Sequence, residues 1–178
     1  MKKNLILLCS IVGCMLFTCN VYGQTTANDY LARGAESLGA GNLYDAILNF
    51  SKAIELDPKS AVAYNGLAAS YQRQGKVEMA IVNFTKAIEL NPSYKEAYFG
   101  RGVCYLKPGD YDKAIMDLSK AIQIDAKNAD AYYYRGQGYF FKKEYAKSME
   151  DVRTAEKLEK TIDPKFLEAL KTSLGTGK

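Results

Sequence analysis

The sequence contains no histidine and no tryptophan, and it has only four cysteines in 178 residues. Three of them, Cys9, Cys14 and Cys19, lie close to the amino terminus, so the rest of the chain holds Cys104 alone. One cysteine without a histidine excludes an internal disulfide, the usual zinc sites and a Cys-His nucleophile pair from that part of the chain. We therefore expect no metal site and no cofactor, and we interpret Cys104 as a small apolar residue on a helix.

A large excess of one charge is also missing. The 24 lysines and arginines exceed the 20 aspartates and glutamates by 4, and the excess falls to +2 without Lys2 and Lys3. Opposite charges are interspersed along the chain, as in Lys52 and Glu55, which is typical of solvated helix faces and not of a basic stripe. Nucleic acid is therefore excluded as an expected partner.

Long apolar runs are absent except near the amino terminus. There, a positively charged start precedes an apolar run from Leu5 to Phe17, and the residues up to Gly23 suit cleavage after that glycine. We interpret residues 1–23 as a secretory signal peptide followed by a short linker at 24–26, and we expect an exported protein, periplasmic or secreted. Segments ending at Cys14 and Cys19 resemble a bacterial lipobox, so a membrane-anchored lipoprotein and an uncleaved anchor are the alternatives.

What the sequence does contain is a repeat with a period of 34 residues. Tyr30 recurs as Tyr64, Tyr98 and Tyr132, and one further step reaches Phe166. Other columns keep the same step, and chance does not produce several such columns together. They are Ala46, Ala80, Ala114 and Ser148; Ala53, Ala87, Ala121 and Ala155; and Phe50, Phe84, Leu118 and Val152.

Each repeat unit has the pattern of two helices. Over residues 61–74, apolar side chains recur every three or four positions, which predicts an amphipathic helix that Gly75 ends. The same pattern predicts a second helix over residues 77–90, and Asn91 followed by Pro92 stops it. Each unit is therefore predicted to be a helical hairpin.

A two-helix unit of this period, with an early aromatic residue, a glycine at the turn, two alanines in the second helix and a proline at the exit, resembles the tetratricopeptide repeat. Four copies match, at residues 27–60, 61–94, 95–128 and 129–162. The last copy departs from the pattern at Lys143, Ser148 and Lys160. The resemblance implies an all-α fold, a right-handed superhelix (solenoid) of about four helix-turn-helix repeats.

The residues after the fourth copy predict one more helix. Asp163 suits an N-cap and Pro164 a first helical residue. We interpret residues 163–173 as a capping helix that packs as a fifth first helix, and residues 174–178 as a flexible tail.

The resemblance also implies a binding groove, because the first helices of tetratricopeptide arrays line a concave face that holds a peptide or helix of another protein. Its early part is small and open here, and its late part is apolar and aromatic. The candidate groove residues are Leu31, Asn65, Ala69, Arg73, Phe99, Val103, Leu106, Tyr133, Tyr134 and Gln137. As an alternative, Phe140 and Phe141 lie under the terminal helix and Tyr133 packs on Phe99, because aromatic residues at helical spacing are usually core.

One ligand class known for such repeats does not fit the sequence. Some relatives bind the acidic C-termini of heat-shock chaperones through a clamp of lysine, asparagine and arginine side chains. The matching positions here hold Leu31, Ala35, Gly66, Glu96 and Gly100. None of these residues can hold a carboxylate in that way, so we exclude this ligand class.

The residues also do not suggest catalysis. Glu96 and Asp130 are the nearest approach to an acid/base pair, and a solvated groove edge explains them better. We therefore expect a non-catalytic scaffold or adaptor for protein-protein interaction in the bacterial cell envelope. The alternative is a self-assembling structural subunit, with a homodimer face near Tyr139, Phe141 and Tyr145.

Overall fold

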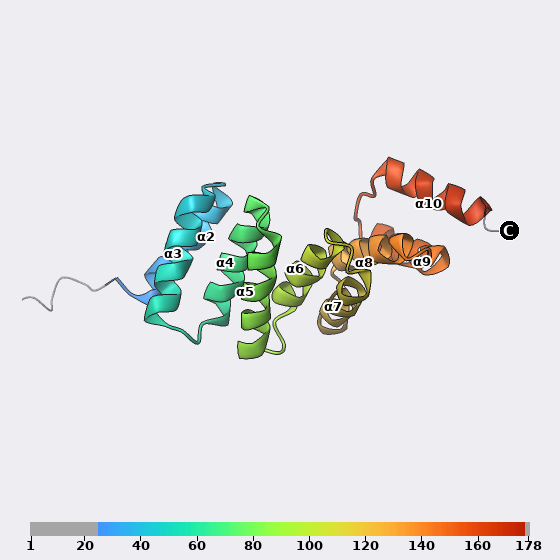
Figure 1. Ribbon diagram of the computed structural model, residues 1–178. Helices are drawn as coiled ribbons and strands as arrows, with labels where there is room; N and C mark the ends of the chain where they lie inside the picture. Colours follow the sequence, from blue (N-terminus) through green and yellow to red (C-terminus); the bar gives the residue numbers. More distant parts are fainter. Residues whose placement is uncertain (1–24, 177–178) are drawn as a thin grey trace, which may run out of the picture.

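The computed structural model of the protein describes residues 25–176, so the segment interpreted as a signal peptide lies outside the described residues. Within that range the chain forms nine α-helices arranged in a row (Figure 1). They are α2 (Ala27–Gly39), α3 (Leu43–Leu56), α4 (Ala61–Gln74), α5 (Val77–Leu90), α6 (Lys95–Leu106), α7 (Tyr111–Ile124), α8 (Ala129–Phe141), α9 (Tyr145–Lys157) and α10 (Pro164–Thr176). The predicted all-α solenoid of four hairpins and a C-terminal helix is confirmed. None of the helices in the described part of the chain is long and apolar enough to span a membrane.

Local sequence sets the ends of the helices. Thr26 and Asp29 form a capping box at the start of α2, and the Ser60 side chain accepts a hydrogen bond from the Ala63 backbone N–H at the start of α4. The turn inside each hairpin places one residue at positive φ: Gly41 (80°), Gly75 (83°), Gly109 (86°) and Lys143 (63°). Lys143 thus adopts the left-handed conformation that glycine adopts in the other hairpins, at a cost of about 1–2 kcal/mol.

Large rings on the second helices pack against glycines on the first helices. A Cβ atom at Gly66 would lie 2.4 Å from the Phe50 ring, and one at Gly100 would lie 2.3 Å from the Phe84 ring. Both rings are buried. The two small-residue columns of the second helices are fully buried, from Ala46 to Ser148 in one and from Ala53 to Ala155 in the other. These contacts hold neighbouring hairpins at a constant offset.

The first hairpin presents a polar face to solvent at its outer end. On α2, Asp29, Arg33 and Glu36 are exposed. One repeat later on α4, the equivalent positions are buried: Ala63, Leu67 and Ser70. A polar outer face is what an end repeat in contact with solvent requires.

The other end is covered by α10, which follows a longer connection than the other first helices. Six residues separate α9 from α10, whereas four separate α7 from α8. The Asp163 side chain accepts a hydrogen bond from the Lys165 backbone N–H at 3.0 Å, as an N-cap does. Leu170 is fully buried in the cluster that covers α9. The helix continues to Thr176, beyond the expected boundary at residue 173, because Leu174 packs against the same cluster.

Candidate binding surface on the inner wall

The first helices of the four hairpins form one continuous surface. They contact one another directly, α2 with α4, α4 with α6, and α6 with α8. Each of α3, α5 and α7 contacts its own first helix and the first helix of the next repeat. The side of α2, α4, α6 and α8 that faces away from the second helices is therefore shared by all four repeats, and we call it the inner wall.

An apolar cluster occupies the inner wall at the third and fourth repeats. The rings of Phe99 on α6 and Tyr134 on α8 meet edge to face, with centroids 5.8 Å apart and an interplanar angle of 63°. Val103 and Leu106 join them, and all four side chains are half-buried against the core around Leu118. We call these four residues the aromatic strip. It unites four of the candidate groove residues across two repeats.

Helix α10 covers the end of the inner wall. Its Phe166 ring contacts Tyr133 at 5.8 Å and Phe140 at 5.4 Å between centroids. The Tyr133 hydroxyl is hydrogen-bonded to Gln137, and burial raises the pKa of Tyr133 above its usual range. Two of the candidate groove residues, Tyr133 and Gln137, therefore lie where the chain's own helix is docked.

The alternative arrangement of the aromatic residues is only partly observed. Phe140 does lie under α10, but the ring against Phe99 is Tyr134, and Tyr133 contacts Tyr134 and Phe166 instead. Phe141 is 53% exposed and stacks on Tyr111 of α7 at 5.1 Å. The difference arises because consecutive residues on a helix point about 100° apart.

In the N-terminal part of the inner wall, three candidate groove residues contribute to packing. Leu31 lies against the core around Phe50, and Ala69 lies against the core around Phe84. Arg73 donates a hydrogen bond to the Leu38 carbonyl at the C-terminal end of α2, so it ties the second repeat to the first.

The fourth candidate in this part, Asn65, contacts Tyr94, the residue that precedes α6. Their side chains are hydrogen-bonded, and burial raises the pKa of Tyr94 above its usual range. The Asn65 Oδ1 atom is buried and has no hydrogen-bond partner among the described residues. Asn65 thus offers one unused acceptor at the border of the second and third repeats.

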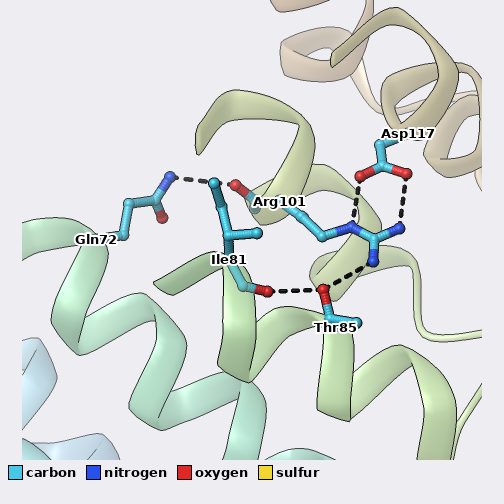
Figure 2. Close-up of polar contacts among 6 residues, drawn as sticks. Gln72, Ile81, Thr85, Arg101 and Asp117 are labelled. Atoms are coloured by element: carbon cyan, nitrogen blue, oxygen red, sulfur yellow. Dashed lines mark hydrogen bonds and ion pairs between the residues drawn. The ribbon is translucent and has the colours of Figure 1, made fainter. Parts of the chain in front are cut away.

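Sequence reasoning missed two largely buried ion pairs between the first and second helices of the third and fourth repeats. Figure 2 shows Arg101 of α6 held by Asp117 of α7, with Nε to Oδ2 at 2.7 Å and Nη2 to Oδ1 at 3.0 Å. Arg101 Nη1 also donates to the Thr85 hydroxyl at 2.9 Å, and that hydroxyl donates to the Ile81 carbonyl on α5. One guanidinium therefore joins three helices from two repeats.

The fourth repeat contains the same arrangement. Arg135 donates to both oxygens of Asp151, at 2.8 and 2.7 Å, and its Nη1 donates to the Ser119 hydroxyl at 3.0 Å. The hydrogen bonds and charge of Asp151 raise the pKa of Arg135 further above its usual range. We call Arg101–Asp117 and Arg135–Asp151 the Arg-Asp pairs.

A signal for these pairs is present in the sequence. The two residues of each pair are 16 positions apart, and the two pairs are themselves one repeat apart. The earlier repeats lack the pair: Arg33 faces Asn49 in the register of the first repeat, and Leu67 faces Asn83 in the second. The arginine and the aspartate of each pair are charged residues on amphipathic helices, and a sequence pattern alone places such residues in solvent.

The carboxylates considered as an acid/base pair lie beside lysines. Glu96 lies 4.0 Å from Lys95, and Asp130 lies 2.5 Å from Lys160. Within residues 25–176, no cluster of three or more histidine, cysteine, aspartate or glutamate side chains could hold a metal ion. The chemistry of the inner wall is therefore that of contact surfaces: apolar rings, amides and paired charges.

Family models match the chain over the same hairpins. Tetratricopeptide repeat models match residues 61–94 and 83–116, and a further model of the repeat matches residues 40–75 and 104–142. Together with the helical hairpins and their 34-residue period, these matches show that the chain belongs to the tetratricopeptide repeat family, whose members act as protein-protein interaction scaffolds.

Solved structures with the same fold include the protein MamA, which is 30% identical, with a TM-score of 0.70 over 75% of this chain and 78% of MamA. The first tetratricopeptide domain of Spaghetti (RPAP3), solved with an HSP90 peptide, is 23% identical, with a TM-score of 0.62 over 65% of this chain and 92% of that one. The APC/C hetero-tetramer Cut9-Hcn1 contains a chain that is 20% identical with a TM-score of 0.76, of which this chain covers 30%. The last two share the fold alone.

Proposed function

We propose that the protein is a non-catalytic adaptor whose inner wall holds an amphipathic segment of a partner protein on the aromatic strip. The observation that carries the proposal is the docking of α10 on Tyr133 and Phe140. Helix α10 is itself an amphipathic segment, and its anchors are Phe166, Leu167 and Leu170. A surface that binds such a helix at one end and continues as Phe99, Val103 and Leu106 suits a second segment of the same chemistry.

The chemistry of the wall narrows the class of ligand. An acidic C-terminal peptide of the kind bound by the Spaghetti domain requires cations on the inner wall. The corresponding positions hold Leu31, Ala35, Gly66, Glu96 and Gly100. The space beside each of the two glycines is occupied by a buried phenylalanine ring. The proposed ligand therefore inserts leucine, isoleucine or phenylalanine side chains and does not depend on a terminal carboxylate.

Photo-crosslinking in the cells that make the protein tests this function. A benzophenone amino acid at Lys107, which is exposed directly after the strip residue Leu106, should give a discrete protein adduct. The adduct should disappear when Phe99→Ala and Tyr134→Ala are introduced together and helicity by circular dichroism is kept. An identical adduct from Glu156, which is exposed on α9, or persistence of the Lys107 adduct in the double variant contradicts binding at the strip.

We further propose that the adaptor acts outside the cytoplasm, periplasmic or secreted, after removal of residues 1–23. The support is the pattern of a charged start, an apolar run and Gly23. Mass spectrometry of the mature protein decides between this and the lipoprotein alternative. A mature chain starting at Gln24 supports cleavage after Gly23, whereas an acylated start at Cys14 or Cys19 shows lipid anchoring.

A further inference from the structure

The second helices carry a row of exposed apolar side chains that the proposed function does not use. Leu48 on α3, Val82 on α5 and Met116 on α7 are 49%, 67% and 62% exposed, although each belongs to a well-packed hairpin. They occupy the same position of successive repeats. We call these three residues the outer stripe. It ends at the fourth repeat, where the equivalent residue is Glu150.

Two more large side chains extend the outer stripe. Tyr44 precedes Leu48 by one turn of α3, and Met79 precedes Val82 by one turn of α5, so they share its face. They are 76% and 44% exposed. Five of the nine large apolar side chains that are exposed in the described residues thus gather on one surface. Single exposed apolar residues are ordinary, but a contiguous group of them marks an interaction surface.

Hollows lie beside the outer stripe between the first and second helix of a repeat. The hollow at Val82 is bounded by Tyr64, Lys86 and Glu89, and the hollow at Met116 by Tyr98, Lys120 and Gln123. Their volumes are about 460 and 590 Å³. An apolar side chain of a partner that enters either hollow meets a tyrosine ring on one side and the stripe residue on the other.

The hollow at Met116 differs from the others in its charged residues. Lys52 and Lys86 pair with Glu55 and Glu89 at 2.9 and 3.0 Å. In the third repeat the acid is replaced, and Lys120 donates to the Gln123 side-chain oxygen at 3.0 Å. The charged residues lining the Val82 hollow and the hollow beside Glu150 balance, whereas the Met116 hollow holds Arg101 and Lys120 against Asp117 alone. The largest of the three hollows therefore has an excess of one positive charge.

We propose that the outer stripe binds a segment of a partner protein that carries apolar side chains for Val82 and Met116 and a carboxylate for Lys120. The surface complements such a segment in both respects, with an apolar row over three repeats and an unbalanced cation at its C-terminal end. An anionic membrane fits less well because the exposed carboxylates of Glu55, Glu78 and Glu89 border the same row. The stripe lies on α3, α5 and α7 and not on the inner wall, so the adaptor can hold two proteins at once.

Selection from a random-peptide display library on the purified protein tests the proposal. Peptides should be enriched that combine aspartate or glutamate with leucine, isoleucine or phenylalanine. On the variant with Val82→Glu and Met116→Glu, this class should lose about tenfold or more in affinity. Lys120→Gln should weaken the same peptides about threefold and reduce their sensitivity to salt, because one charge contact is lost.

Matched variants locate the effect. Ala146→Glu adds a carboxylate to the exposed face of α9, beyond the stripe, and should leave the peptides bound. Phe99→Ala alters the inner wall and should also leave them bound, so failure of the proposed inner-wall function is distinguishable from failure here. If the double glutamate variant unfolds on heating before the parent does, Val82→Gln with Met116→Gln replaces it.

Several results overturn the proposal. If no enriched peptide loses affinity in the variant at Val82 and Met116, the outer stripe is not a binding site. Enrichment of basic peptides contradicts the role of Lys120. Sedimentation that changes from dimer to monomer in the double variant assigns the stripe to a second copy of the chain. Binding to vesicles of anionic phospholipid that the double variant loses assigns it to a membrane.

Discussion

The first two repeats and the last two share one backbone plan and differ in what locks the helices together. In the N-terminal half, α2 to α5, the buried part of the junction between repeats is apolar, with Phe50 enclosed by Gly34 and Gly66. In the C-terminal half, α6 to α10, the two Arg-Asp pairs are added, and each reaches back to a hydroxyl of the preceding repeat. The same geometry is therefore stabilised mainly by ring packing in one half, with one exposed hydrogen bond from Arg73, and by ring packing with buried polar links in the other.

The two halves also differ on the inner wall and at the ends. The N-terminal end exposes Asp29, Arg33 and Glu36 to solvent, whereas the C-terminal end needs α10 to cover Tyr133 and Phe140. The aromatic strip lies in the half that the Arg-Asp pairs reinforce. Because a binding surface is more effective when its side chains are held in place before the ligand arrives, the buried pairs suit a preformed site.

Breaking one Arg-Asp pair should have the largest effect. Asp117→Ala leaves the guanidinium of Arg101 without its carboxylate in a site where the two side chains are 14% and 2% exposed. We expect a loss of about 3–5 kcal/mol in the free energy of unfolding, the range for removing one partner of a buried pair. Urea denaturation followed by circular dichroism measures it.

The matched control lies one repeat earlier. Asn83 is the equivalent residue of the N-terminal half, and it donates only to the Met79 carbonyl of its own helix. Asn83→Ala should change the unfolding free energy by less than about 0.5 kcal/mol. Equal effects of the two substitutions would remove the distinction between the halves.

Loosening α10 should have the next largest effect, and it should stay local. Leu170→Ala removes a fully buried side chain from the cluster with Val152 and Ile162 and should cost about 2–3 kcal/mol. Because each repeat depends mainly on its neighbours, amide hydrogen exchange should accelerate in α9 and α10 and stay unchanged in α2 to α5. Glu168→Ala, at an exposed position of the same helix, is the control. Uniform acceleration along the chain would show that the halves are not separable.

Filling the space at the junction of the halves should have a smaller effect. Gly100→Ala places a Cβ atom 2.3 Å from the Phe84 ring, so the ring or the helix must shift, at a cost of about 1–2 kcal/mol. Gly39→Ala meets no atom within 4 Å and should be neutral or stabilise the helix by about 0.5 kcal/mol. Thermal denaturation compares the two alanines. A Gly100→Ala variant as stable as the parent would show that the junction is looser than its contacts indicate.

The sequence was sufficient for the hairpins because their signals are local. Gly75 directly follows α4 and Pro92 follows α5, and the helical period before each of them gives these two helices the bounds that the structure has. The small columns also identify the close helix contacts, since only alanine or glycine fits where backbones approach. These features depend on neighbours a few residues away or one repeat away.

The candidate site was predicted less completely because its contacts depend on exact direction and on distant segments. Tyr133 and Tyr134 are adjacent, yet one faces α10 and the other faces Phe99. The position of α10 depends on a six-residue connection that no repeat pattern specifies. The space beside Gly66 and Gly100 is occupied by Phe50 and Phe84 from the second helices of the preceding repeats, a contact that the first helices alone do not reveal.

The reactivity of Cys104, which lies near the α5–α6 junction between the halves, tests the comparison without any change in stability of the parent protein. Its thiol is buried among residues of α4, α5 and α6, and burial raises the pKa of Cys104 to about 11. At pH 8 only about one thiol in a thousand is then ionised in the closed protein, against about one in four for an exposed cysteine. Labelling by a disulfide reagent should therefore be limited by opening of the α5–α6 junction.

The labelling rate of Cys104 reports which half of the molecule opens. If breaking the Arg101–Asp117 pair lets the C-terminal half unfold cooperatively, Asp117→Ala should strongly accelerate the labelling of Cys104. Leu170→Ala, which loosens only α10, should accelerate it little. The two rates measured at pH 8 without urea decide the point. Rapid labelling of the parent protein, at the rate seen in urea, would mean that the junction between the halves is already open and that the Arg-Asp pairs do not hold it.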